Sequence, residues 1–106
     1  MRHAIRTSVL VLLSVPVLNC GPVQARVAVR EGHRLYRDES FRKAIDQYKI
    51  VLANDPNDIE ATFYLGSSYQ QLFEPGSEST KGNLEEAIKN YQAVLAATPS
   101  AGDTKY

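Results

Sequence analysis

The sequence is poor in the residues that build cross-linked or metal-bound folds. Its 106 residues include one cysteine, two histidines and no tryptophan. A disulfide framework and a zinc site built from Cys and His ligands are therefore both excluded. Twelve Lys and Arg residues balance twelve Asp and Glu residues, and this zero net charge argues against a general nucleic-acid binder.

The patterns that carry enzyme chemistry are also missing. His33 is the only histidine after residue 25, and no cysteine or serine pattern around it indicates a nucleophile with its base. Glu85 and Glu86 are adjacent on a predicted helix and point in different directions, so they do not form a pair of catalytic carboxylates. The glycines are scattered and form no phosphate-binding loop. We therefore expect a binding module rather than an enzyme, with no cofactor and no metal.

The first 25 residues have the pattern of an export signal. Arg2 and Arg6 precede an apolar run over residues 9–18. A helix that crosses a bilayer needs about 20 apolar residues, whereas this run is much shorter and contains Pro16. We therefore predict a signal peptide over residues 1–25, rather than a spanning anchor, and an exported mature protein.

Two cleavage sites compete at the end of this segment. Val23-Gln24-Ala25, before Arg26, is the kind of sequence that an ordinary signal peptidase reads. Val17-Leu18-Asn19-Cys20-Gly21 resembles the lipobox of bacterial lipoproteins, in which the cysteine is acylated and becomes the first residue, although Asn19 stands where that motif has Gly, Ala or Ser. The first site would give a periplasmic protein, and the second a protein anchored by a lipid on Cys20. No other attachment to a membrane is expected.

The rest of the sequence contains one pattern twice. The first set consists of Gly32, Ala44, Tyr48 and Pro56, and the second of Gly66, Ala87, Tyr91 and Pro99. The pattern resembles the tetratricopeptide repeat, in which a small residue marks the contact of two helices and a proline closes each copy. The resemblance implies two helical hairpins, residues 25–58 and 59–101, stacked as a short right-handed α-solenoid over residues 26–101. A tail follows at residues 102–106.

Hydrophobic periodicity predicts the same helices without the resemblance. Phe41, Ala44, Ile45, Tyr48, Val51 and Leu52 form one apolar stripe of a helix. Ser40 is predicted to cap the start of this helix. Asn57 with Glu60, and Asn83 with Glu86, resemble capping boxes at the starts of the next two helices. With no alternating strand pattern after the signal segment, the prediction is an all-α fold of four helices.

The second copy is nine residues longer than the first between its two helices. The extra segment, residues 74–82, is polar and contains Pro75-Gly76, a pair typical of turns. It is either a plain flexible connection or a loop that contributes to binding, because insertions in repeat proteins gather on one face.

In this repeat family the first helix of each copy lines a groove, so the outward residues of that helix are candidates for ligand contact. They are Arg26, Arg30, His33 and Arg37 in the first copy and Glu60, Phe63, Ser67 and Gln70 in the second. A basic stripe beside a neutral polar one would receive an acidic or carboxylate-ended peptide. Charge on an outward helix face is also expected without any ligand.

Two copies leave one end of a repeat array uncovered. Such arrays bury their faces by stacking and usually need three or more units. The side of the last helix with Ile88, Leu95 and one edge of Tyr91 is therefore expected to stay open. We expect a second copy of the chain or another protein helix to cover it, unless the sequence is a piece of a longer repeat protein.

Two functions of different classes remain. The first is a non-enzymatic adaptor in the bacterial cell envelope, which holds a peptide or protein segment in its groove. The second is a structural role, in which the chain only self-assembles through its open end. Neither function involves a nucleic acid.

Overall fold

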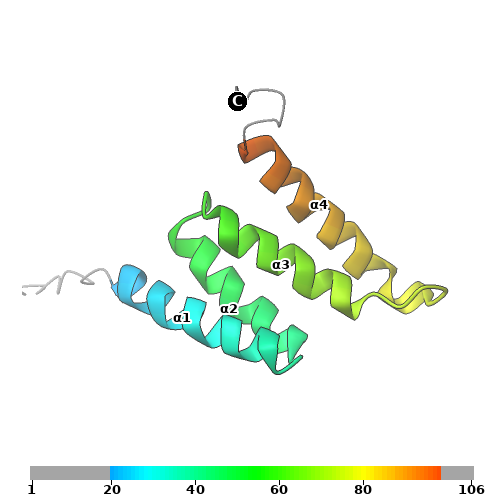
Figure 1. The fold of residues 1–106 in the computed structure, drawn as a ribbon, viewed down its shortest axis with the longest axis horizontal. Helices are drawn as coiled ribbons and strands as arrows, with labels where there is room; N and C mark the ends of the chain where they lie inside the picture. The colour runs from blue at the N-terminus through cyan, green and yellow to red at the C-terminus, as the bar shows by residue number, and fades with distance from the viewer. Residues whose placement is uncertain (1–19, 99–106) are drawn as a thin grey trace, which may run out of the picture.

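The computed structural model describes residues 20–98, which form four α-helices and one short 3-10 helix. These are α1 (Cys20–Arg37), α2 (Phe41–Asn54), α3 (Ile59–Leu72), η1 (Glu78–Thr80) and α4 (Lys81–Ala97). Each α-helix packs against the next one in the chain (Figure 1). No strand occurs in residues 20–98, so the prediction of an all-α fold is confirmed. Residues 1–19, with most of the predicted signal peptide, and the predicted tail at 102–106 lie outside the described residues.

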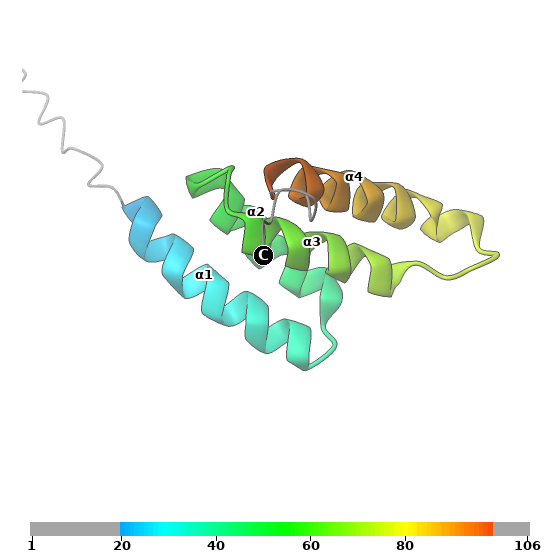
Figure 2. The same cartoon turned by 45° about the horizontal axis from the view of Figure 1, so that its top comes forward.

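The four helices form two hairpins, α1 with α2 and α3 with α4 (Figure 2). In both hairpins a glycine of the first helix faces a tyrosine of the second. A Cβ atom added to Gly32 would lie 2.9 Å from Cε1 of Tyr48, and one added to Gly66 would lie 3.1 Å from Cβ of Asn90 and 3.3 Å from the Tyr91 ring. The small residue of each predicted repeat therefore stands at a close contact between two helices.

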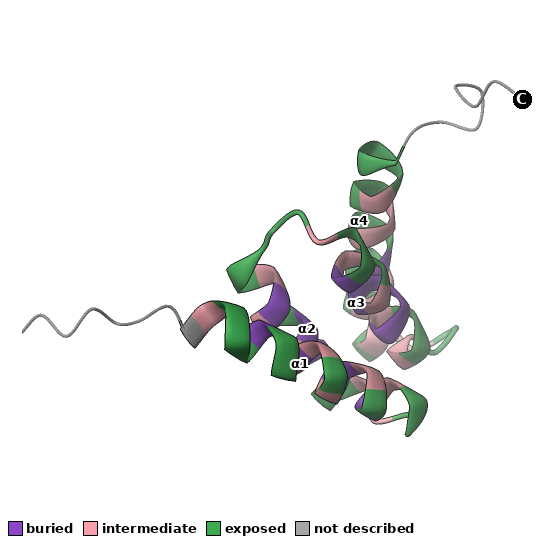
Figure 3. Ribbon diagram, turned by 60° about the vertical axis from the view of Figure 1, so that its left-hand side comes forward, coloured by how far each residue is buried: buried purple, intermediate pink, exposed green. Residues whose placement is uncertain are grey.

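The hydrophobic core lies mainly between α1, α2 and α3 (Figure 3). It consists of Ala28, Leu35, Ala44, Ile45, Tyr48, Val51, Ala61 and Leu65. The stripe predicted for α2 supplies four of these residues, because its apolar positions face both neighbouring helices. Helix α4 contributes a single buried residue, Ala87, and is the least covered of the four helices.

The chain is already helical at Cys20, the first residue that the structure describes. The predicted boundary after Ala25 falls inside this helix, and Ala25 itself is buried. Proline is tolerated in the first turn of a helix, since the amide hydrogen it lacks would have no partner there, so Pro22 does not interrupt α1. None of the described helices is both long enough and apolar enough to span a membrane.

The helix caps differ from the predicted ones. Asp58, not Asn57, caps α3, and its Oδ1 accepts a hydrogen bond from the Ala61 amide at 3.0 Å. The backbone N–H of Asn57 instead donates a hydrogen bond to Oδ1 of Asp55 within the turn. Ser40 precedes α2 as predicted, but its side chain makes no capping hydrogen bond.

The capping box predicted at Asn83 is also wrong, because α4 begins at Lys81. Asn83 lies inside the helix and donates its side-chain amide to the carbonyl oxygen of Leu72 at 3.4 Å. The last two residues of the predicted insertion therefore belong to α4. The remaining loop has its own structure, in which the Thr80 hydroxyl accepts a hydrogen bond from the Glu74 amide at 2.9 Å.

Candidate functional site

All eight predicted groove residues lie on α1 or α3, and side chains join these two helices at two points. His33 of α1 meets Glu60 of α3, with 3.0 Å between Nε2 and Oε1. One turn further along α1, the Tyr36 hydroxyl lies 2.6 Å from the Ser67 hydroxyl. We call the surface formed by the predicted residues and these contacts the α1–α3 face.

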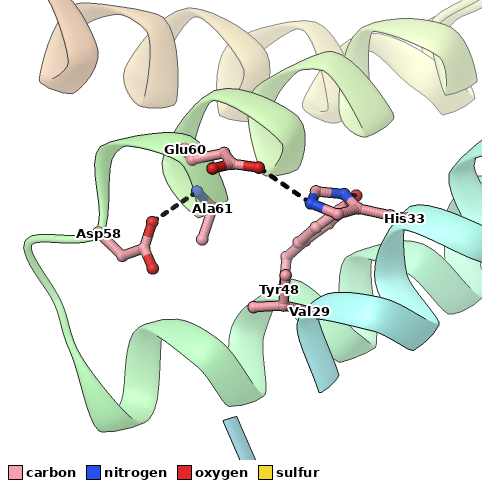
Figure 4. Close-up of a pocket in the computed structure, with 6 residues that line it drawn as sticks. All are labelled: Val29, His33, Tyr48, Asp58, Glu60 and Ala61. Atoms are coloured by element: carbon pink, nitrogen blue, oxygen red, sulfur yellow. Dashed lines mark hydrogen bonds and ion pairs between the residues drawn. The ribbon is translucent and has the colours of Figure 1, made fainter. Parts of the chain in front are cut away.

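His33 also reaches into the core of the first hairpin (Figure 4). Its Nδ1 lies 2.7 Å from the hydroxyl oxygen of Tyr48, while its Nε2 points to Glu60. An ionised Glu60 can only accept a hydrogen bond, so Nε2 carries the proton, and in the neutral ring the Tyr48 hydroxyl donates to Nδ1. This one side chain therefore links α1, α2 and α3.

Tyr48 is the buried end of this hydrogen-bond chain. Its side chain is completely shielded from solvent. Burial raises the pKa of the Tyr48 phenol well above its ordinary value, and the neighbouring Tyr64, Tyr36 and Glu60 add to the increase. The hydroxyl therefore stays protonated and remains available as the donor to His33.

A small cavity of about 30 Å³ opens beside His33 and Glu60 (Figure 4). It is lined by Val29, His33, Tyr48, Asp58, Glu60 and Ala61. This volume suits water rather than a side chain or a small organic molecule. A ligand at this position would therefore lie across the α1–α3 face instead of entering it.

Tyr64 is the centre of an aromatic cluster on the α1–α3 face. Its ring makes edge contacts with His33 at 4.8 Å, Tyr36 at 5.2 Å and Phe63 at 5.4 Å between centroids, and it stacks on Tyr48 at 5.7 Å. Aromatic pairs of this kind add about 0.5–1.5 kcal/mol each beyond the burial of area. These contacts therefore hold the aromatic side chains beneath the α1–α3 face, which we call its floor, in one arrangement.

The predicted residues Phe63 and Gln70 extend the face towards α4. The Tyr91 hydroxyl donates to Oε1 of Gln70 at 2.6 Å, and the rings of Phe63 and Tyr91 are 5.8 Å apart. Phe63 nevertheless remains 45% exposed, so its ring offers apolar surface to a ligand.

The arginines of α1 differ in what they contact. Arg34 binds Glu31, where it holds the pKa of that carboxyl below its usual range, and it also binds Asp38, with 3.0 Å between Nη1 and Oδ2. Arg26, Arg30 and Arg37 are exposed, and they take part in none of the hydrogen bonds and ion pairs found within residues 20–98. These three guanidinium groups are therefore available to a ligand.

The sequence identified His33 and Glu60 but not their contact, and it missed Tyr48 as the partner of His33. One signal for Tyr48 was present. It stands at the aromatic position of the predicted repeat and faces Gly32, the residue next to His33. The contact with Glu60 depends on how α3 packs, which no local pattern reports. Ser67 is buried rather than exposed, since Tyr36 covers its hydroxyl.

Comparison with known protein families, with curated proteins and with solved structures found no match. Within residues 20–98, no three His, Cys, Asp or Glu side chains gather into a group that could hold a metal ion. The function is therefore inferred from the contacts of the α1–α3 face.

The raised pKa of Tyr48 predicts how stability depends on pH. The unfolded state loses the phenolic proton of Tyr48 near pH 10, whereas the folded state keeps it to higher pH. Because the folded state then binds more protons than the unfolded state, the free energy of unfolding falls as pH rises above 10. Tyr48→Phe lacks this proton and should lose about 1 kcal/mol at pH 7 from the missing hydrogen bond. Urea unfolding from pH 8 to 11 should show the stability difference between the protein and Tyr48→Phe shrinking above pH 10. A difference that stays constant or grows would contradict the assignment.

Proposed function

We propose that this chain is a non-enzymatic adaptor of the tetratricopeptide repeat type, which holds an extended peptide or protein segment on its α1–α3 face. The proposal rests on one observation. Three exposed arginines and an exposed aromatic ring lie on the same face, and hydrogen bonds and aromatic contacts between α1 and α3 hold that face in place. Arg26, Arg30 and Arg37 supply the charge, and Phe63 supplies apolar area. A preorganised surface of this kind loses little conformational entropy of its own when it binds a flexible segment.

The repeat assignment is supported by the two equivalent hairpin contacts. Gly32 meets Tyr48 and Gly66 meets Tyr91 at corresponding positions, although the second hairpin has a longer connection. Two units built around the same contact would stack as the short right-handed solenoid that the resemblance implies. In that arrangement the first helix of each unit, α1 and α3, lines one face.

The chemistry of the α1–α3 face favours an acidic segment. Arginine binds carboxylates through two parallel hydrogen bonds, which gives both affinity and orientation. An alternative function, a purely structural role through self-assembly, would need none of these exposed cations.

We test the adaptor by fluorescence anisotropy with short labelled peptides that are acidic, neutral or basic. The acidic peptide should bind most tightly. The triple variant Arg26→Ala/Arg30→Ala/Arg37→Ala should weaken its binding at least about tenfold, equivalent to 1.4 kcal/mol. The control Arg42→Ala/Lys43→Ala/Lys89→Ala removes the same charge from exposed positions of α2 and α4 and should change binding little. Equal losses in both variants, or no preference for the acidic peptide, would reject the adaptor.

We further propose that the protein is exported and anchored in the cell envelope through Cys20. Residues 20–25 are helical and continuous with the rest of α1, and Ala25 is buried. Cleavage after Ala25 would remove this part of the helix together with Ala25, whereas cleavage before Cys20 keeps every described residue of α1. The helical structure of residues 20–25 therefore favours the second of the two sites.

The mass of the N-terminal peptide of the exported protein distinguishes the two cleavage sites. We expect an acylated Cys20 as the first residue in a bacterial expression host. In the variant Cys20→Ala the acyl mass should disappear and the protein should no longer mature at this position. An N-terminus at Arg26 would show that the anchor proposal is wrong.

A further inference from the structure

Helix α4 exposes a surface that its counterpart α2 buries. The internal repeat aligns Tyr48 with Tyr91, and therefore Ile45 of α2 with Ile88 of α4. Ile45 lies in the core formed by α1, α2 and α3 and is only 6% exposed, whereas Ile88 is 47% exposed. Leu95, about one turn beyond Tyr91 and on the same side of α4 as Ile88, is 73% exposed.

The apolar residues on the uncovered side of α4 have a spacing that suits helix packing. Leu84, Ile88 and Leu95 lie at positions i, i+4 and i+11, and of these Ile88 and Leu95 are exposed while Leu84 is half-buried. These positions fall on one side of a helix and can form a seam, by which one helix packs along another. Helix α3 buries Ala61 and Leu65, at positions i and i+4, in the core that it shares with α2. The shape of the uncovered surface therefore fits a helix rather than an extended segment.

The α1 end of another copy is a poor fit for this seam. The residues that align with Ala61, Leu65, Ser68 and Leu72 of α3 are Val27, Glu31 and Arg34 of α1 and Asp38 in the turn after it. Arg34 forms ion pairs with both Glu31 and Asp38, so this surface is charged from residue 31 onward. Burying these charges against the apolar residues of α4 would cost their hydration without offering new partners. Head-to-tail stacking of copies is therefore disfavoured.

Helix α4 itself is the better fit. Its seam is apolar, and its two lysines balance its two glutamates, so that two α4 helices meet without net repulsion. Helix α1, with four arginines against one glutamate, lacks this balance. A surface that is apolar and uncharged overall can pair with its own copy across a two-fold axis.

We propose that a second copy of the chain covers α4, so that the protein forms a two-fold dimer with α4 packed against α4. The proposal does not depend on the adaptor function, because its residues are separate from the three exposed arginines. One helix per copy is a small interface, and we expect a dissociation constant on the order of micromolar. A dimer would also place two α1–α3 faces in one assembly, which strengthens binding to a partner with two acidic segments.

Sedimentation equilibrium over a range of micromolar concentrations tests the dimer. The sample is the chain from residue 20 onward, which contains every described helix, with Cys20→Ser to prevent disulfide formation. We expect a reversible equilibrium between monomer and dimer. Leu95→Glu, and separately Ile88→Glu, should weaken dimerisation at least tenfold while circular dichroism shows unchanged helix content, because both side chains are exposed in the single copy.

Val23→Glu and Val27→Glu are the matched controls. Both valines lie on α1 with exposures of 63% and 61%, and their replacement should leave the dimer intact. A monomer at all concentrations would overturn the proposal and would mean that something other than a second copy covers α4. Open-ended oligomers, or a dimer that Val27→Glu disrupts and Leu95→Glu does not, would overturn it in favour of head-to-tail contact. Peptide binding is measured separately, so failure of the dimer leaves the adaptor proposal standing.

Discussion

The close approach of a tyrosine ring to a glycine backbone is the constraint on which the rest of the structure depends. Tyr48 occupies the space that a side chain at position 32 would need, and Gly66 is packed less tightly, against Cβ of Asn90 and the Tyr91 ring. A glycine inside a helix costs about 1 kcal/mol relative to alanine. The chain accepts this cost twice, because the glycines allow a large ring to pack directly on the backbone of the neighbouring helix.

The same contact builds the α1–α3 face. With its ring against Gly32, Tyr48 presents its hydroxyl to His33, the next residue of α1, and His33 carries the connection outward to Glu60. Tyr64 packs against both rings, with an edge contact to His33 and a stacked contact to Tyr48. Hydrogen bonds and aromatic contacts thus connect the buried contact of Tyr48 with Gly32 to the α1–α3 face. They hold the polar side chains of His33 and Glu60 in place there. The exposed arginines stand beside a floor that needs little rearrangement to receive a ligand.

The sequence predicted the helices well because their apolar positions repeat with the helical period over several turns. The α2 stripe and the helix contact at Gly32 both follow from such local patterns. The caps were harder, since several polar residues in each turn can supply a capping oxygen, and the packing of the turn selected Asp58 over Asn57. The contact between His33 and Glu60 joins residues 27 positions apart, so it depends on the packing of α3 and not on any local pattern.

The central claim is that both hairpins are held by the same contact of glycine with tyrosine. Nuclear Overhauser effects measured on the isotope-labelled chain from residue 20 onward test it most directly. The account predicts strong effects between the ring protons of Tyr48 and the α-protons of Gly32, and between those of Tyr91 and Gly66. A helical protein that lacks both effects would contradict the account, because its helices would then pair through other faces.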